Sequence, residues 1–420
     1  MNNDIEKRLN NFDATVRKDA LKEVVDHFNT GKLKAAEASK LHNMHCHTIY
    51  SYNGYAFSPS YIAYLAKKEG WFAAGIVDFD VLDAVDEFLN ACKMLNIRAL
   101  CGVETRAYLN EFSDKVINSP GEPGIAYHMG IGFTSSKLPS PDTINFLKTM
   151  KERAATRTKV LVDKVNSFLK PVILDFEKDA APLTPKGNVT ERHVCEAYEN
   201  KAIEIFPNKT DRAIFWSEKL GINIDEANQL INDSVALQGL IRSKTMKSGG
   251  VGYVKAGPES FPPVQEFNDF IIASGGIPTI AWLNGLTPGE QTAEKLVDHH
   301  ITLGAAALNI IPDRNWNISN IEEKQQKLKE LKRIIQICED RDMPIIVGTE
   351  MNAPGLKLVD SFEAIELKDY VDIFVKGAAI MTAHTILEQE GKGYLSKWAA
   401  NKFESKSEKN KYFENFGRNL

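Results

Sequence analysis

The sequence lacks the features that mark several large classes of protein. Only 5 of its 420 residues are cysteines, without paired spacing, which excludes a disulfide-rich scaffold and predicts a reducing, cytoplasmic location. No run of about 20 apolar residues is present, so no membrane-spanning segment is expected, and residues 1–19 are too charged to form the core of a secretory signal. With 51 basic and 56 acidic residues, the net charge of −5 predicts no nucleic-acid partner and no anionic membrane surface.

What is present is the composition of an ordinary folded chain, with 43% hydrophobic and 25% charged residues. At roughly 100–200 residues per domain, the length fits one large domain with an insertion or two ordinary domains. The charge balance is compatible with an enzyme that acts on a small molecule.

The hydrophobic pattern predicts strands that alternate with helices. Apolar residues in 5–28 recur at steps of three to five, which predicts an amphipathic helix that ends at Thr30-Gly31. Later helical patterns, at 59–69, 81–95, 288–303 and 321–341, separate short apolar runs. Such alternation predicts βαβ units and a parallel sheet, and about seven units favour a barrel over an open sheet. The predicted strands are 43–47, 73–77, 99–103, 126–133, 277–281, 305–311, 345–348 and 372–381.

One block interrupts this alternation. Between Ser140 and Leu240 the pattern is almost wholly helical, and a Gly- and Pro-rich loop follows at 247–263. We therefore predict a helical insertion in a barrel and a charged tail that forms a surface helix with a frayed end. The predicted helices of the insertion are 143–169, 190–203, 211–220 and 225–240. The predicted parts are an N-terminal helical segment (1–40), the barrel (41–136 and 262–395), the insertion (137–261) and the tail (396–420).

The strongest local signal for chemistry is His45-Cys46-His47. Residues i and i+2 of a strand point to the same face, so the two imidazoles can bind one transition metal. The alternative is a pair of ordinary surface histidines. Polar side chains also stand at or near other predicted strand ends, where ligands collect in parallel α/β folds and barrels. These are Asp78, Asp80, Glu104, His128 and Glu350. Any one of them could be a helix cap or a solvated side chain, but together they favour a metal site.

Six segments in order resemble the polymerase and histidinol phosphatase (PHP) family of metal-dependent phosphoesterases. They are HCHTIYS (45–51), GIVDFDVLDA (75–84), GVET (102–105), AYHMGIGF (126–133), ASGGIPTIAW (273–282) and GTEMN (348–352). The resemblance implies a distorted (β/α)7 TIM-like barrel of the PHP type, with a helical insertion where the pattern places one.

The resemblance also implies metal ligands, although several positions differ. His45, His47, Glu104 and His128 keep the family's residue type, and Glu350 stands where the family has an aspartate. Phe79, Trp282 and Asn352 stand where it has histidines, and neither a phenyl ring nor an indole can donate a lone pair to a metal. The implied cofactor is therefore one or two divalent ions (Mn, Zn, Fe or Mg) in a degenerate site.

Five further residues are candidates for catalysis or substrate binding. Asp78 could orient a ligand or act as a base, or it could cap the helix expected near Val81, a role that suits Asp80 better. Trp282 could stack on a base or sugar, or fill a vacated metal position. His193 matches a histidine often seen in the family's insertion, and we place it at the mouth of the site. Arg106 and Arg314 follow strand ends and could hold a phosphate.

The sequence is compatible with three functions. The first is a metal-dependent hydrolase of the PHP phosphoesterase type, in which metal-activated water attacks a small phosphorylated substrate. The second is a catalytically degenerate barrel that binds a ligand or partner without turnover, as the three replaced histidines suggest. A one-metal hydrolase of amides is a third possibility.

Overall fold

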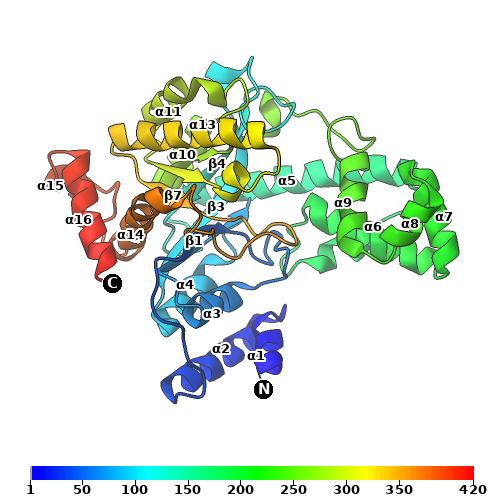
Figure 1. Ribbon diagram of the computed structural model, residues 1–420, viewed down its shortest axis with the longest axis horizontal. Coiled ribbons are helices and arrows are strands. Elements are labelled where there is room, and N and C mark those ends of the chain that lie inside the picture. The colour runs from blue at the N-terminus through cyan, green and yellow to red at the C-terminus, as the bar shows by residue number, and fades with distance from the viewer. Residues whose placement is uncertain (1) are drawn as a thin grey trace. The chain divides into compact units, whose positions relative to one another are not determined.

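The computed structural model describes residues 2–420, with side chains from Asp4 onward. The chain forms two compact units, a barrel unit (Met1–Ile49, Asn53–Leu147 and Pro258–Leu420) and a helical unit (Tyr50–Tyr52 and Lys148–Gly257). The barrel unit is built on one seven-stranded sheet, nearly closed on itself, with the strands in sequence order (Figure 1). The strands are β1 (His42–Cys46), β2 (Ala73–Phe79), β3 (Arg98–Tyr108), β4 (Ile125–Ile131), β5 (Ile277–Trp282), β6 (Ala307–Ile310) and β7 (Ile345–Val347).

The sheet is mixed, so the prediction of a parallel sheet was wrong at one strand. β1–β2–β3 and β5–β6–β7 are parallel, whereas β4 runs antiparallel to both β3 and β5. The connection from β3 to β4 holds only one helical turn, Asn110–Phe112. A parallel neighbour needs a longer crossover, usually through a helix, so β4 returns in the opposite direction.

A single bridge at Glu350 joins the last strand region to the first. The backbone N–H of Glu350 donates to the carbonyl of His45 (2.8 Å), and the N–H of His47 donates to the carbonyl of Glu350 (2.7 Å). Glu350 and Met351 both have positive φ, at 62° and 53°. Two consecutive non-glycine residues in this region are uncommon and tend to occur at functional sites.

Helices pack against the outside of the sheet (Figure 1). Their starts follow ordinary sequence signals: Ser58, for example, accepts a hydrogen bond from the N–H of Tyr61 at the start of α3, and Pro59 is the first helical residue. An apolar layer fills the space between β5–β7 and α11 and α13. These helices are α3 (Pro59–Lys68), α4 (Val85–Leu95), α10 (Val264–Ala273), α11 (Ala293–Thr302) and α13 (Ile321–Asp340), and the short α12 (Asp313–Trp316) follows β6 and contacts α13.

The predicted strand at 372–381 was wrong, because this segment belongs to helix α14 (Val371–Glu388). Its apolar residues run almost without interruption, and such a run has no period that separates a buried helix from a strand. By length and composition Lys368–Glu388 could cross a membrane, but 67% of its most apolar window is buried. Since α14 packs with inward-facing residues such as Met44, Leu100 and Ile346, we identify it as a core helix.

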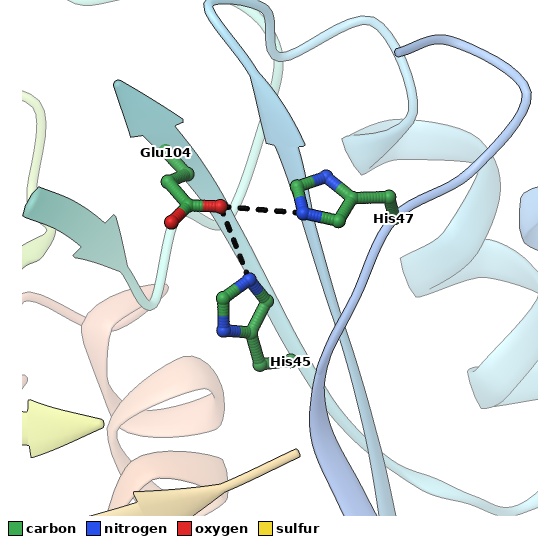
Figure 2. Close-up of side chains that lie close together, drawn as sticks. All are labelled: His45, His47 and Glu104. Carbon is green, nitrogen blue, oxygen red and sulfur yellow. Dashed lines mark hydrogen bonds and ion pairs between the residues drawn. The ribbon is translucent and has the colours of Figure 1, made fainter. Parts of the chain in front are cut away.

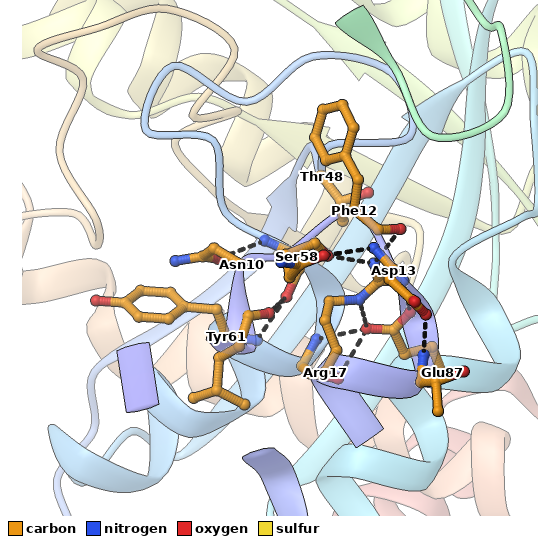
Figure 3. Close-up of polar contacts among 12 residues, drawn as sticks. Asn10, Phe12, Asp13, Arg17, Thr48, Ser58, Tyr61 and Glu87 are labelled. Atoms are coloured by element: carbon orange, nitrogen blue, oxygen red, sulfur yellow. Dashed lines mark hydrogen bonds and ion pairs between the residues drawn. The ribbon is translucent and has the colours of Figure 1, made fainter. Parts of the chain in front are cut away.

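The two ends of the chain pack on the barrel unit. The fully buried Arg17 of α2 (Ala14–Asn29), which follows α1 (Asn2–Leu9), pairs with Glu87 of α4 through two nitrogens and donates to the carbonyls of Asn11 and Phe12 (Figure 3). At the other end, α15 (Lys397–Lys402) precedes α16 (Lys406–Arg418), which packs on α14 and buries Phe413. The guanidinium of Arg98 binds the carbonyls that end α16, so this helix is anchored where a frayed end was predicted.

The helical unit has its own core, in which Trp216 is fully buried. The predicted helix 225–240 is in fact two helices, because the side chain of Asp233 accepts from the N–H of Ala236 and starts a new one. The helices are α5 (Pro141–Phe168), whose first turns belong to the barrel unit, α6 (Glu191–Ile205), α7 (Lys209–Leu220), α8 (Ile224–Leu230) and α9 (Ser234–Thr245).

Candidate metal centre

Three predicted ligands come together at the carboxyl end of β1 and in the carboxyl-terminal half of β3. The Nε2 atoms of His45 and His47 each lie 3.2 Å from the same oxygen of Glu104, Oε2 (Figure 2). All three side chains are at most 3% exposed, and their ligand atoms lie within 4.8 Å of one another. Ligand atoms 2.0–2.2 Å from a tetrahedral ion are separated by about 3.4 Å. The two 3.2 Å distances therefore fit three corners of one coordination sphere.

An irregularity in β1 accompanies this geometry. The register between β1 and β2 shifts between Asn43 and Cys46, and such bulges re-aim side chains. Asn43 lies at the shift: its Oδ1 accepts from the N–H of His45 (3.1 Å), and its Nδ2 donates to the Thr349 hydroxyl (2.8 Å). A Cβ at Gly348 would lie 2.5 Å from both Asn43 Oδ1 and His45 N, so only glycine fits beside this turn. Sequence reasoning missed Asn43, although a polar residue inside a buried strand was a usable signal.

The charges within the cluster reinforce one another. Burial alone would lower the pKa of His45, but the charge and hydrogen bond of Glu104 outweigh it and raise that pKa overall. Burial would raise the pKa of Glu104, and the charge of His45 with the hydrogen bonds of both imidazoles instead lowers it well below its usual value. The carboxylate is therefore held ionised, as a metal ligand must be, while a proton on His45 competes with any cation.

The structure does not bring His128 to this cluster. Residues opposite each other in the β3–β4 ladder share a face, and there Glu104 pairs with Met129 whereas His128 pairs with Thr105. His128 therefore points to the outer side, where its Nε2 lies 2.7 Å from Asn268 Oδ1 and its ring stacks on His300 at 5.1 Å. Burial lowers the pKa of His128 to about 4, as expected for a neutral histidine packed under helices. The prediction that His128 is a metal ligand was wrong, because alternation along β4 places it on the face of the sheet opposite to Glu104.

Glu350 lies beside the cluster but is bonded elsewhere. Its carboxylate forms a short ion pair with Arg314 of α12, and both charges act on His45, Glu350 raising and Arg314 lowering its pKa. Sequence reasoning named both residues but not their pairing, because residues 36 positions apart give no local signal.

Phe79 and Trp282, which the sequence resemblance aligns with histidines, have different surroundings. Phe79 pairs in register with Glu104 and stacks on the ring of His47, with the ring centroids 4.2 Å apart. The ring centroid of Tyr127 lies 6.4 Å from that of Phe79. Trp282 is only 2% exposed and belongs to the apolar layer under α11 and α13. It is therefore neither a stacking platform nor a filler of a vacated metal position, and both predictions for it were wrong.

Asp78 holds the chain that follows His47. Its two carboxylate oxygens accept from the N–H and the hydroxyl of Thr48, each at 2.7 Å. Neither Asp78 nor Asp80 caps a helix at Val81, because α4 begins only at Val85; Asp80 accepts instead from the Thr105 hydroxyl. The contacts of Asp78 suit a residue that positions His47, and its role as a base stays a prediction.

The two remaining candidates have polar partners of their own. Arg106 lies two residues after Glu104 on the same face of β3, donates to Glu122 (2.7 Å) and stacks on Phe261 (4.3 Å). His193 belongs to the helical unit, where it forms a capping box with Thr190 and burial lowers its pKa to about 3. Its place at the mouth of the site stays a prediction.

Comparison with known proteins indicates the fold and leaves the family open. No family model and no curated protein matches the sequence. One similar solved structure is an amidohydrolase from Chromobacterium violaceum with bound sulfate and no metal: it is 14% identical, with a TM-score of 0.50 over 75% of this chain and 88% of that one. Another, from Bifidobacterium adolescentis and assigned as a metal-dependent phosphoesterase, is 16% identical, with a TM-score of 0.49 over 80% of this chain and 96% of that one. The first likeness shows that this chain shares its fold with a hydrolase.

Proposed function

We propose that this protein is a metal-dependent hydrolase that acts on a small phosphorylated substrate. The observation that carries the proposal is the convergence of His45, His47 and Glu104, buried and already spaced as ligands of one ion. These three side chains would hold the ion, which when bound supplies activated water and stabilises developing negative charge. The PHP type of the reaction rests on the sequence resemblance and on the fold.

The surrounding residues suit the roles that such a reaction needs. Asp78 fixes Thr48 and thereby the position of His47. Phe79 covers one face of the His47 ring and excludes water from that side. Arg106, near the carboxyl end of β3, and Arg314, in α12 after β6, can orient an anionic group through their N–H donors.

A second candidate is a barrel that binds a ligand without turnover. Within residues 2–420, the structure groups three metal-ligating side chains at one place, which supports one ion and no two-ion clamp on a phosphoryl group. Phe79, stacked where a further imidazole would add a ligand, also favours this reading.

Metal content and turnover separate the two candidates. Chelator-treated protein is incubated with Mn²⁺, Zn²⁺ or Fe²⁺, its bound metal is counted, and hydrolysis of generic phosphoesters is followed. We expect one equivalent of metal and turnover that depends on it. One equivalent without hydrolysis of any phosphoester or amide would support the binding barrel, and a protein that stays metal-free would end the proposal.

Metal affinity should also depend on pH in a direction that the cluster sets. Because the pKa of His45 is raised, a proton must leave before the ion binds, and affinity should fall about tenfold for each pH unit below that pKa. Competition with a chelating dye between pH 5.5 and 8.5 measures this dependence. An affinity that does not change over this range would contradict the protonation assigned to His45.

The stability of the metal-free protein should change with pH in the direction opposite to that of the metal affinity. A raised histidine pKa stabilises the fold below the ordinary value of about 6.5, and this contribution is lost as the pH rises through the folded pKa. The lowered pKa of Glu104 stabilises the fold above about 4.3 and is lost only in stronger acid. Raising the pH from 6 to 8.5 should therefore lower the free energy of unfolding of the metal-free protein and raise its affinity for the metal.

A further inference from the structure

The ion pair of Arg314 and Glu350 joins a buried group to a partly exposed one. The Glu350 side chain is 9% exposed, and its backbone is fixed by the hydrogen bonds to His45 and His47. The Arg314 side chain is 43% exposed and projects from the short helix α12. An arriving solute can therefore reach the arginine more easily than the glutamate.

The pair also leaves most of the guanidinium unused. Nη2 of Arg314 donates to Oε2 of Glu350, and within the described chain no other hydrogen bond from this guanidinium is present. A guanidinium carries five N–H donors in a planar fork that matches the oxygens of a phosphoryl group. Arg314 therefore has donors to offer an oxyanion.

The two charges act on the metal cluster with opposite signs. Glu350 is held next to His45 and His47 by backbone hydrogen bonds, so its carboxylate attracts positive charge at the cluster, and the guanidinium of Arg314, paired with that carboxylate, opposes it. A divalent ion held by His45 would experience the same two influences. The pairing with Arg314 weakens the attraction that the Glu350 carboxylate offers to an ion.

We propose that Arg314 is an exchangeable counter-ion that couples an oxyanion site to the metal centre. In the metal-free protein it holds Glu350; when the oxyanion group of a substrate binds, Arg314 turns to it and frees Glu350 to join His45, His47 and Glu104 around the ion. The inference rests on the proposed function and gives Arg314 a positioning role. By linkage, the oxyanion and the cation each tighten the binding of the other by the same factor.

The test measures Zn²⁺ affinity with and without sulfate, the probe oxyanion, in the wild type and in Arg314→Gln. For the wild type, sulfate should tighten Zn²⁺ binding at least about fivefold, the lower end of usual coupling. Arg314→Gln should bind Zn²⁺ about tenfold tighter than the wild type without sulfate, because the opposing charge is gone and Glu350 is released. Sulfate should then have no further effect.

Arg333→Gln is the matched control. It breaks another Arg–Glu pair, with Glu294 of α11, on the exposed outer helices. This variant should bind Zn²⁺ and respond to sulfate as the wild type does, and thermal unfolding checks that both variants are folded.

The outcomes separate this inference from the proposed function. If the wild type binds Zn²⁺ but Arg314→Gln binds no tighter and responds to sulfate equally, the exchange is wrong and the metal site stands. If Arg333→Gln reproduces the effect of Arg314→Gln, a general change of surface charge explains the result and the exchange is wrong. If the wild type binds no Zn²⁺ or Mn²⁺, the proposed function fails and the exchange fails with it.

Discussion

Glu104→Gln is expected to weaken the binding of Zn²⁺ or Mn²⁺ by at least about 100-fold. Changes to residues that only orient a ligand already cost about 10–100-fold, and both imidazoles contact the Glu104 carboxylate directly. An amide keeps the shape of the side chain but removes the negative charge that attracts the cation. Isothermal titration of the chelator-treated variant measures the loss.

The control for this variant is Glu199→Gln in the helical unit. Glu199 is also a buried glutamate that accepts two side-chain hydrogen bonds, from Ser234 and Gln238, but it lies outside the metal cluster. It should leave metal affinity unchanged. A Glu104→Gln protein that binds the ion as tightly as the wild type would show that the three side chains are no metal site.

Gly377→Ala is expected to destabilise the barrel unit by about 3 kcal/mol, at the upper end of the usual cost of overpacking. The Cβ of an alanine at this position in α14 would lie 1.7 Å from the carbonyl oxygen of Ile345 in β7. Both partners in this contact are backbone, so neither can move aside as a flexible side chain would. Urea unfolding compares the variant with the wild type.

The control for this variant is Gly239→Ala in α9, where a Cβ meets no atom within 4 Å. Alanine should stabilise this helix by up to about 1 kcal/mol, because glycine loses more backbone entropy on folding. The two variants make the same chemical change, and their effects should have opposite signs. A Gly377→Ala protein as stable as the wild type would contradict the close approach of α14 to β7.

The strands were predictable where their apolar runs were short and bounded. β1, β2, β4, β5, β6 and β7 lie where the pattern placed them, within one or two residues at each end, whereas β3 runs on to Tyr108. The direction of β4 was not predictable, since it depends on how the chain returns after β3. The segment that became α14 was assigned to the wrong class because its apolar residues have no period.

In the candidate site too, the residues that follow from local spacing were predictable and those that depend on the folded structure were not. His45 and His47 share a face by strand spacing alone, so their convergence was predictable. His128 and Trp282 were placed at the site because of the motifs that contain them. The face of the sheet that each occupies depends on its position within the strand, and both side chains face the outer helices. The pairing of Arg314 with Glu350 joins separate strand ends and needs the folded structure.

The bridge at Glu350 connects the last strand region to β1 and also fixes the backbone of two proposed metal ligands. Its two hydrogen bonds connect to the backbone of His45 and of His47, the same residues that present the imidazoles. Local opening is easiest where few backbone contacts resist it. A local opening of the sheet that breaks these two hydrogen bonds would displace both imidazoles together. Closure of the sheet and metal binding therefore depend on the same backbone hydrogen bonds.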